Sequence, residues 1–181
     1  KLTLSALLAL LGCFFFFANV GVFWTYIERI ATLIGLSSQE IGNGLATGAI
    51  AGIIAALSAA WIGDRFGRIL PLALGAALSL IALWCFNQPF NFLIFAGAMV
   101  LYQLGWNFSL TYQYSGVGAV DKSERAIAAA PAFHGAGAAA GPALAAIFVT
   151  NTDLSPVVAI AAICVFLSLA SFVFAFRLKT S

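Results

Sequence analysis

The chain has 181 residues, of which 63% are apolar and only 8% are charged. Soluble domains carry about a quarter charged residues, so this composition excludes a water-soluble globular protein and indicates an integral membrane protein. The net charge of +2, without any run of Lys or Arg, also excludes a nucleic-acid-binding protein.

The apolar stretches are long enough to cross a bilayer six times, because a spanning helix needs about 20 residues. The predicted fold class is an all-α membrane protein, in which residues 1–181 form one bundle of six transmembrane helices. Turns rich in Pro, Asn and Asp are predicted at 87–91 and 150–156. The spans are predicted at Leu4–Tyr26, Ile41–Ile62, Ile69–Phe86, Phe92–Tyr114, Ala126–Val149 and Val157–Phe176.

Six spans place both termini on one side of the membrane, together with seven of the eight Lys and Arg residues. Cytoplasmic loops carry the Lys/Arg excess, so we expect this side to be cytoplasmic, in a plasma membrane such as a bacterial inner membrane. The chain begins with Lys, has no cleavable signal pattern and is expected to be part of a longer polypeptide. The seven residues are Lys1, Arg65, Arg68, Lys122, Arg125, Arg177 and Lys179.

In the first span, Asn19 and Tyr26 are seven residues apart and share a helix face, which makes them candidates for a substrate cavity. Glu28 and Arg29 follow while the sequence is still apolar, and Glu28 projects nearly opposite Asn19 on an ideal helix. Glu28 is the best carboxylate for proton coupling, with Arg29 beside it. The alternative is a solvated helix end with an ordinary pair at headgroup level.

The second span carries Gly44, Gly48 and Gly52, each four residues apart on one helix face. In the fifth span, Gly137 and Gly141 form a comparable face. Small residues at this period let two helices approach closely in lipid. Two alternatives stay open: these faces pack against a partner bundle, or they pack inside this one.

Between the second and third spans lies the loop Gly63-Asp64-Arg65-Phe66-Gly67-Arg68. Asp64 can accept hydrogen bonds from a neighbouring helix N-terminus, and Arg68 can pair with Asp64 or with Asp121 or Glu124. Such contacts form a latch that favours one of two conformations. The alternative is topological, with Arg65 and Arg68 as inside anchors and Gly67 in a tight turn.

The fourth span has a polar stripe of Gln103, Asn107, Thr111 and Tyr114, at spacings of four, four and three. Amides are costly in hydrocarbon, so the stripe is predicted to face a watery cavity, with Trp106 as an aromatic wall. The alternative is hydrogen bonding between helices, for which Asn and Gln are common.

His134 is the sole histidine and lies about 15 Å into the fifth span, near the bilayer midplane. It is a candidate for proton coupling. Pro131 and Pro142 each free a carbonyl in the same helix, so the alternative is a neutral histidine bonded to such a carbonyl. Cys13, Cys85 and Cys164 have no metal-type spacing, so no metal or other cofactor is predicted.

The loop with its flanking spans resembles the signature loop of the major facilitator superfamily of secondary transporters. The family pattern is Gly, three residues, an acid, a base, any residue, Gly and two bases. The central part is matched by Asp64-Arg65-Phe66-Gly67-Arg68, whereas Ala60 and Ile69 depart from the pattern.

Two weaker similarities lie further along the chain. Gly137-Ala-Ala-Ala-Gly141-Pro142 resembles the family's Gly-xxx-Gly-Pro helix, although Ala145-Ala146 replaces its closing glycines. The segment from Asp121 through Glu124 to Arg125 lies where the family has a loop running from an acid to an arginine. Members typically have twelve spans in two halves, so the resemblance implies a six-span half, most similar to the C-terminal half.

Together these patterns predict secondary transport of a small solute by alternating access, coupled to a proton gradient. The expected partners are the other six-span half or a second copy of this chain, the lipid bilayer and a small-molecule substrate. One rival is a self-assembling homodimeric carrier or channel. Another is a membrane-embedded enzyme, but the chain lacks a convergent His, Asp or Glu cluster, so no catalytic residue is predicted.

Overall fold

The computed structural model describes residues 2–86, 91–121, 123–150 and 153–180, and these contain helices and no strand. An all-α bundle is therefore confirmed. Lys1, Lys122 and most of the predicted turn at 87–91 lie outside the described residues. The six helices are α1 (Leu4–Leu33), α2 (Ser38–Ile62), α3 (Ile69–Cys85), α4 (Phe92–Val120), α5 (Arg125–Ala146) and α6 (Ser155–Thr180).

Four helices, α1, α2, α4 and α6, extend by two or more residues beyond the apolar stretches that predicted them. α1 continues past Tyr26 and α4 past Tyr114, because polar residues continue a helix where an apolar pattern has stopped. The start of α2 is set by a capping box: the N–H of Glu40 donates to Ser37 Oγ at 3.3 Å, and the N–H of Ser37 donates to the Glu40 carboxylate at 2.9 Å.

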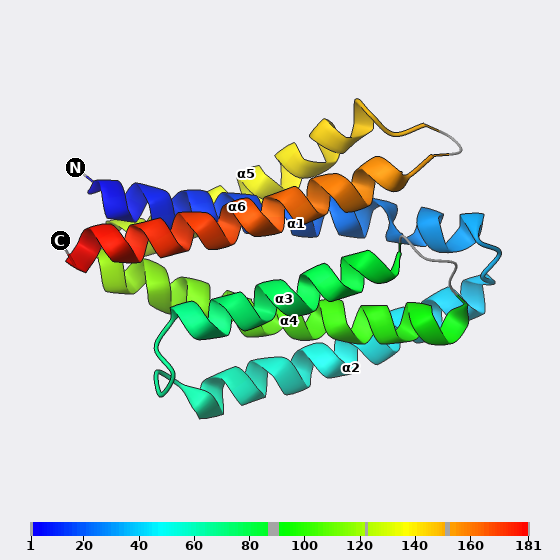
Figure 1. Cartoon of the computed structure of the whole chain (residues 1–181), viewed down its shortest axis with the longest axis horizontal. Coiled ribbons are helices and arrows are strands. Elements are labelled where there is room, and N and C mark those ends of the chain that lie inside the picture. Colours follow the sequence, from blue (N-terminus) through cyan, green and yellow to red (C-terminus); the bar gives the residue numbers. More distant parts are fainter. Residues whose placement is uncertain (1, 87–90, 122, 151–152, 181) are drawn as a thin grey trace.

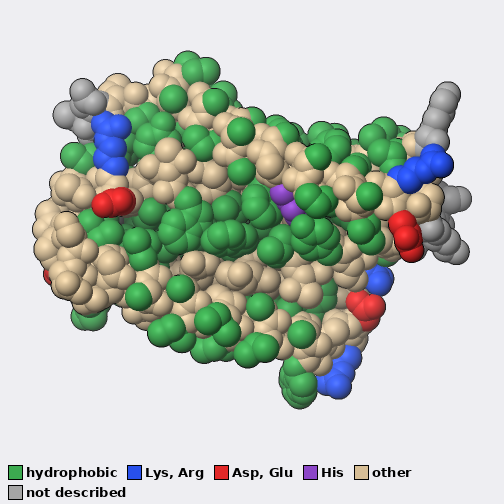
Figure 2. Space-filling model, turned by 180° about the vertical axis from the view of Figure 1, so that it is seen from behind, with side chains coloured by type: hydrophobic (Ala, Val, Ile, Leu, Met, Phe, Trp, Pro, Cys, Tyr) green, Lys and Arg blue, Asp and Glu red, His purple; other side chains and the backbone are tan. Residues whose placement is uncertain are grey.

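Within the described residues, four helices are both long enough and apolar enough to cross a membrane, namely α1, α2, α4 and residues 155–178 of α6. The third helix is apolar but has 17 residues. In α5, Pro131, Pro142, His134 and several glycines lower the hydropathy. Figure 2 shows apolar side chains across the middle of the molecule, with charged side chains gathered at its two ends. This distribution fits a bundle that lies across a bilayer.

Figure 1 shows how the connections divide between the two ends of the bundle. Both termini lie at one end, together with the loop between α2 and α3 and the turn between α4 and α5. At the opposite end lie the α1–α2 and α5–α6 connections, where an Arg29 guanidinium nitrogen donates to the carbonyl of Thr150 at 3.1 Å. The basic loop residues are thus concentrated at the end that holds the termini.

The helices pack as two sets of three. The first helix lies along α5 and α6, and α4 lies along α2 and α3 in the same way. The two sets meet where α3 faces α6 and where α1 faces α4. Exchanging α1, α2 and α3 with α4, α5 and α6 maps these main interfaces onto one another, so the bundle contains an internal structural repeat.

Glycines allow the closest approaches inside each set. A Cβ atom on Gly137 would collide with the backbone carbonyl of Phe14, and one on Gly141 with that of Ala18. In the other set, a Cβ on Gly44 would come 2.5 Å from the ring of Phe95. Gly48 and Gly52 face α4 in the same manner. Of the two alternatives for these faces, the structure places them inside this bundle, α2 against α4 and α5 against α1.

This packing predicts that Gly137→Ala lowers the melting temperature, whereas Gly135→Ala on the same helix does not. The added methyl at position 137 meets backbone, which cannot move aside, and overpacking costs about 1–3 kcal/mol. For a chain of this size, that cost corresponds to about 2–12 °C. Nothing lies within 4 Å of a Cβ at Gly135, and alanine is the better helix former. Thermal unfolding in detergent checks both variants, and equal shifts would contradict the α1–α5 interface.

Candidate functional site

An open groove of about 430 Å³ runs along the interface of α2 and α4. Three predicted cavity residues line its α4 side, namely Gln103, Trp106 and Asn107. The structure thus places Gln103 and Asn107, the first two residues of the predicted polar stripe, on a concave surface. The α2 side consists of small and aliphatic residues, which are Ala49, Gly52, Ile53, Ala56 and Leu57.

Gln103 and Asn107 form a connected pair of side-chain amides in this groove. The Nδ2 atom of Asn107 donates to the backbone carbonyl of Gln103 and to its Oε1, both at 3.0 Å. Gly52 lies opposite, and a Cβ there would come 2.6 Å from Asn107 Nδ2. Among the described residues, Gln103 Nε2 and Asn107 Oδ1 have no hydrogen-bond partner, so the pair offers a donor and an acceptor to the groove.

The other two residues of the stripe, Thr111 and Tyr114, are not part of the groove lining. Thr111 is exposed. The hydroxyl of Tyr114 lies 3.3 Å from Nδ1 of His134, so this residue links α4 to α5 rather than lining the groove. Trp106 also contacts the first helix, because its ring centroid lies 5.8 Å from that of Trp24. The indole N–H groups of both tryptophans are buried without a partner.

His134 lies between α5, α1 and α4 and is 5% exposed. Its ring stacks on Phe17 with centroids 4.2 Å apart, and its Nε2 is buried without a hydrogen-bond partner. The alternative in which a proline-freed carbonyl satisfies His134 is not what the structure shows, since the polar contact comes from Tyr114 on another helix. One ring nitrogen thus contacts the Tyr114 hydroxyl, and the other has no partner among the described residues.

The predicted residues of the first span separate into three environments. Asn19 is buried, and its Oδ1 accepts a hydrogen bond from the Tyr102 hydroxyl at 3.2 Å. Tyr26 is half-buried against the apolar core, whereas Glu28 is exposed. Eleven residues, or about 16 Å of helix, separate Glu28 from the Phe17 that covers the histidine. The structure therefore does not bring Glu28 and His134 together.

Sequence reasoning missed Tyr102, Tyr112 and Ser115. Tyr102 is fully buried and stacks on Phe23 with ring centroids 3.8 Å apart. A signal was present, because a phenol inside a membrane span needs a hydrogen-bond partner and Asn19 is among the few polar residues at similar depth. Ser115 carried no such signal, since its importance depends on the position of the loop.

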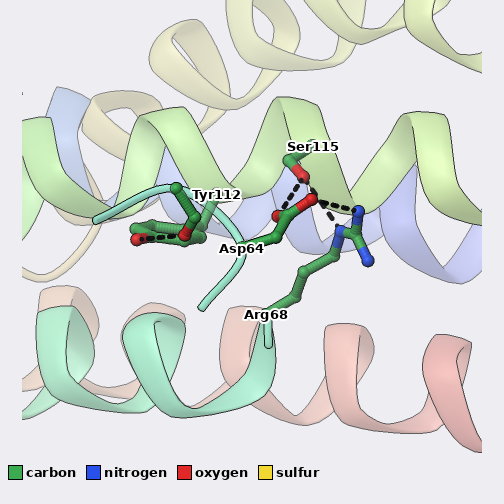
Figure 3. A network of polar contacts seen from close by, with 5 residues as sticks. Asp64, Arg68, Tyr112 and Ser115 are labelled. Carbon is green, nitrogen blue, oxygen red and sulfur yellow. Dashed lines mark hydrogen bonds and ion pairs between the residues drawn. The ribbon is translucent and has the colours of Figure 1, made fainter. Parts of the chain in front are cut away.

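The loop between α2 and α3 is held against α4 by the network in Figure 3. Arg68 pairs with Asp64 at 3.2 Å, and its Nε donates to Ser115 Oγ at 2.9 Å. Ser115 in turn donates to Asp64 Oδ1 at 3.5 Å, and the Tyr112 hydroxyl donates to the carbonyl of Gly63 at 3.0 Å. The partners of Asp64 are thus side chains of the loop and of α4, rather than a helix N-terminus as predicted.

The backbone of this loop depends on its glycines. Gly63 and Gly67 have φ values of 56° and 67°, which an L side chain rarely adopts. The predicted turn at Gly67 is therefore present, and Gly63 provides a second one. Arg65 points away from the network, with its guanidinium 5.2 Å from the ring centroid of Trp61.

Among the described residues, Arg68 pairs with neither Asp121 nor Glu124. Asp121 instead caps α5. It accepts hydrogen bonds from Ser123 Oγ at 2.6 Å and from the N–H of Ala126 at 2.8 Å. The Ser123 hydroxyl, followed by these backbone N–H groups, holds the pKa of Asp121 below its ordinary value of 3.8. Glu124 is exposed with a φ of 61°, and Arg125 is exposed at the start of the helix.

No group of three or more His, Cys, Asp or Glu side chains that could hold a metal ion occurs among the described residues. The cysteines are free thiols, with Cys13 and Cys164 buried and Cys85 half-buried.

The sequence was compared with known proteins, known structures and protein-family models. The search of curated proteins and the search of solved structures found no match. A family model described as Major Facilitator Superfamily matches residues 9–181, which is nearly the whole chain. This match agrees with the resemblance of the Asp64–Arg68 loop, and the family indicates a transporter rather than an enzyme. The chain belongs to the Major Facilitator Superfamily.

Proposed function

We propose that this chain moves a small solute across the membrane by alternating access, with the α2–α4 groove as one wall of the solute pathway. One observation carries the proposal: α4 holds both the groove amides and the loop network. Gln103 and Ser115 are twelve residues apart, or about 18 Å along one continuous helix. A movement of α4 that opens or closes the groove therefore also strains or relaxes the contacts at the loop.

The loop network acts as the latch in this proposal. Asp64, Arg68 and Ser115 contact one another when α4 lies against the loop, so they stabilise that conformation over one in which α4 has moved. The end of the bundle that holds the latch is proposed to be cytoplasmic, because it carries the excess of basic residues.

The solute is proposed to be uncharged. The described lining of the groove contains no ionisable side chain, and its accessible polar groups are the two amides, because the indole N–H of Trp106 is buried. Such a surface binds a neutral solute that has hydrogen-bonding groups and an apolar face.

Coupling to protons is proposed to involve His134 with Tyr114, and Glu28 beside Arg29 nearer to the opposite end. Because His134 and Glu28 are far apart along the helices, they would act at separate points of the pathway rather than as one pair. The other wall is proposed to come from a second six-span half, and a second copy of this chain would serve the same purpose.

Uptake into proteoliposomes tests the groove. The intact transporter is assayed with radiolabelled glucose, uridine and nicotinamide, and with charged glutamate and lysine for comparison. The Gln103→Leu/Asn107→Leu variant is expected to raise the KM for the transported neutral solute about tenfold, because two hydrogen bonds of about 0.5–1.5 kcal/mol are lost.

The chain offers a matched control on α2. Gln39 and Asn43 are also amides four residues apart, joined by a hydrogen bond of 3.0 Å, and both lie outside the groove. Gln39→Leu/Asn43→Leu is expected to leave the KM unchanged. Uptake of charged solutes alone, or an equal change in both double variants, would contradict the proposed pathway.

A further inference from the structure

A small cavity lies between the helices, away from the groove and the latch. Its volume is about 10 Å³, and it is bounded by α3, α4 and α6, with Phe16 of α1 at one side. Several polar side chains line it although it is buried in a membrane protein. They are Ser79 from α3, Ser109 and Gln113 from α4, and Ser168 from α6.

Three of the four polar side chains around this cavity, those of Ser79, Ser109 and Gln113, have groups without a partner among the described residues. Gln113 is 1% exposed, and its Oε1 is buried without a hydrogen bond. The hydroxyls of Ser79 and Ser109 also make no hydrogen bond to any described residue. By contrast, the hydroxyls of Ser58 and Ser171 each donate to the carbonyl four residues earlier, at 2.7 Å.

Glycines bring these hydroxyls together and keep other atoms out. A Cβ on Gly75 would collide with Ser109 Oγ, and a Cβ on Gly105 would come 2.7 Å from Ser79 Oγ. The close approach of α3 and α4 is thus built around two hydroxyl groups that face the cavity. An apolar contact would not require serine at either position.

We infer that this cavity binds one ordered water molecule, which bridges Ser79, Ser109 and Gln113. The volume equals about one water-sized probe, and a buried water typically makes about three hydrogen bonds to otherwise unsatisfied groups. In hydrocarbon, each unsatisfied polar group is costly, so the occupant satisfies groups that no protein atom reaches.

The water occupies a particular place in the architecture. Ser79 and Gln113 belong to the set of α2, α3 and α4, whereas Ser168 belongs to the set of α1, α5 and α6. Ser168 donates to the carbonyl of Gly12 in α1 at 2.8 Å, so it fixes the α6 side of the cavity. The water therefore lies beside the junction of the two three-helix sets: its partners Ser79, Ser109 and Gln113 belong to one set, and Ser168 lines the cavity from the other.

A crystal or electron cryomicroscopy map of the intact protein at about 2 Å resolution tests this site directly. The expected result is a density peak about 2.7–3.2 Å from Ser79 Oγ, Ser109 Oγ and the Gln113 amide. Direct hydrogen bonds among these side chains, with no peak between them, would overturn the inference. A peak about 2.4 Å from several oxygens would overturn it in favour of a sodium ion.

The sign of a thermal shift provides a second test. If water satisfies Gln113, then Gln113→Leu removes one of its partners and lowers the melting temperature by about 2–6 °C. If the amide is unsatisfied, leucine removes a buried polar group and raises the melting temperature, which would overturn the inference.

Two controls complete the thermal experiment. Ser109→Ala is expected to lower the melting temperature as Gln113→Leu does, whereas Ser58→Ala, which loses only a bond within its own helix, is expected to change it little. Replacing Na⁺ by K⁺ in the buffer is expected to leave the melting temperature of the unmodified protein unchanged. Stabilisation by Na⁺ alone would identify a cation site and overturn the assignment to water.

Discussion

Asp64→Asn is expected to lower the transport rate about tenfold while the solute affinity stays within about twofold of its original value. The substitution removes the ion pair with Arg68 and weakens the acceptor that orients Ser115. Binding at the groove, about 18 Å away along α4, does not depend on these contacts. Uptake rates and solute binding to the purified protein, measured on the same preparations, separate the two effects.

The expected tenfold effect comes from a change in the free-energy difference between the two transport conformations, not from a change in the free energy of unfolding. Asp64 is 64% exposed, and exposed ion pairs contribute about 0–1 kcal/mol. The bond from Arg68 to Ser115 adds about 0.5–1.5 kcal/mol. A change of about 1.4 kcal/mol in one conformation alters the ratio of the two by about tenfold, yet shifts the melting temperature by only a few degrees.

Comparing the two arginines distinguishes a latch from a topological anchor. Arg68 contacts Asp64 and Ser115, whereas Arg65 contacts the ring of Trp61. A latch predicts that Arg68→Gln slows transport much more than Arg65→Gln, and that Asp64→Asn adds little to Arg68→Gln. Equal effects of the two arginine variants would instead support anchoring by positive charge.

The fold could be predicted from the sequence because lipid leaves few alternatives. Long apolar stretches must form helices to satisfy their backbone groups, so the number and order of the helices followed from the positions of these stretches along the sequence. The ends of the helices could not be predicted as well. They depend on caps such as Ser37 with Glu40 and on polar turns that continue beyond the apolar core.

The candidate site was predicted in part. The spacing of Gln103 and Asn107 placed both amides on one face, and the structure shows them joined in a groove. The same spacing included Tyr114, which instead reaches His134 on α5. Periodicity along one helix cannot tell which neighbour lies beside each turn, because that depends on how six helices pack.

Pairings between distant segments were the least predictable. Asn19 with Tyr102, and Arg68 with Ser115, are 83 and 47 residues apart, and nothing local in the sequence connects them. The glycine faces were recognised from their period, but their partners could be assigned only from the structure. Gly137 touches the backbone of α1 and Gly52 touches Asn107. Sequence patterns thus identified which helix faces pack closely, but not which helices they pack against.

His134→Ala is expected to abolish the dependence of uptake on a pH gradient while solute exchange at equal pH continues. The histidine is buried, its Nδ1 lies 3.3 Å from the Tyr114 hydroxyl, and its Nε2 has no partner, so a proton taken up there changes the contacts between α4, α5 and α1. Without the imidazole, a gradient has no group to act on at this depth. Uptake into proteoliposomes with and without an imposed gradient measures the effect.

The same experiment separates proton coupling from a structural role of the buried ring. Phe133→Ala also removes a ring from α5, one residue away and facing a different groove, so it controls for loss of packing.

Tyr114→Phe keeps the packing but removes the hydroxyl, and is expected to move the pH midpoint of uptake without abolishing coupling. Glu28→Gln is predicted to reduce coupling as well. If His134→Ala and Glu28→Gln both retain full gradient-driven uptake, neither residue carries the coupled proton.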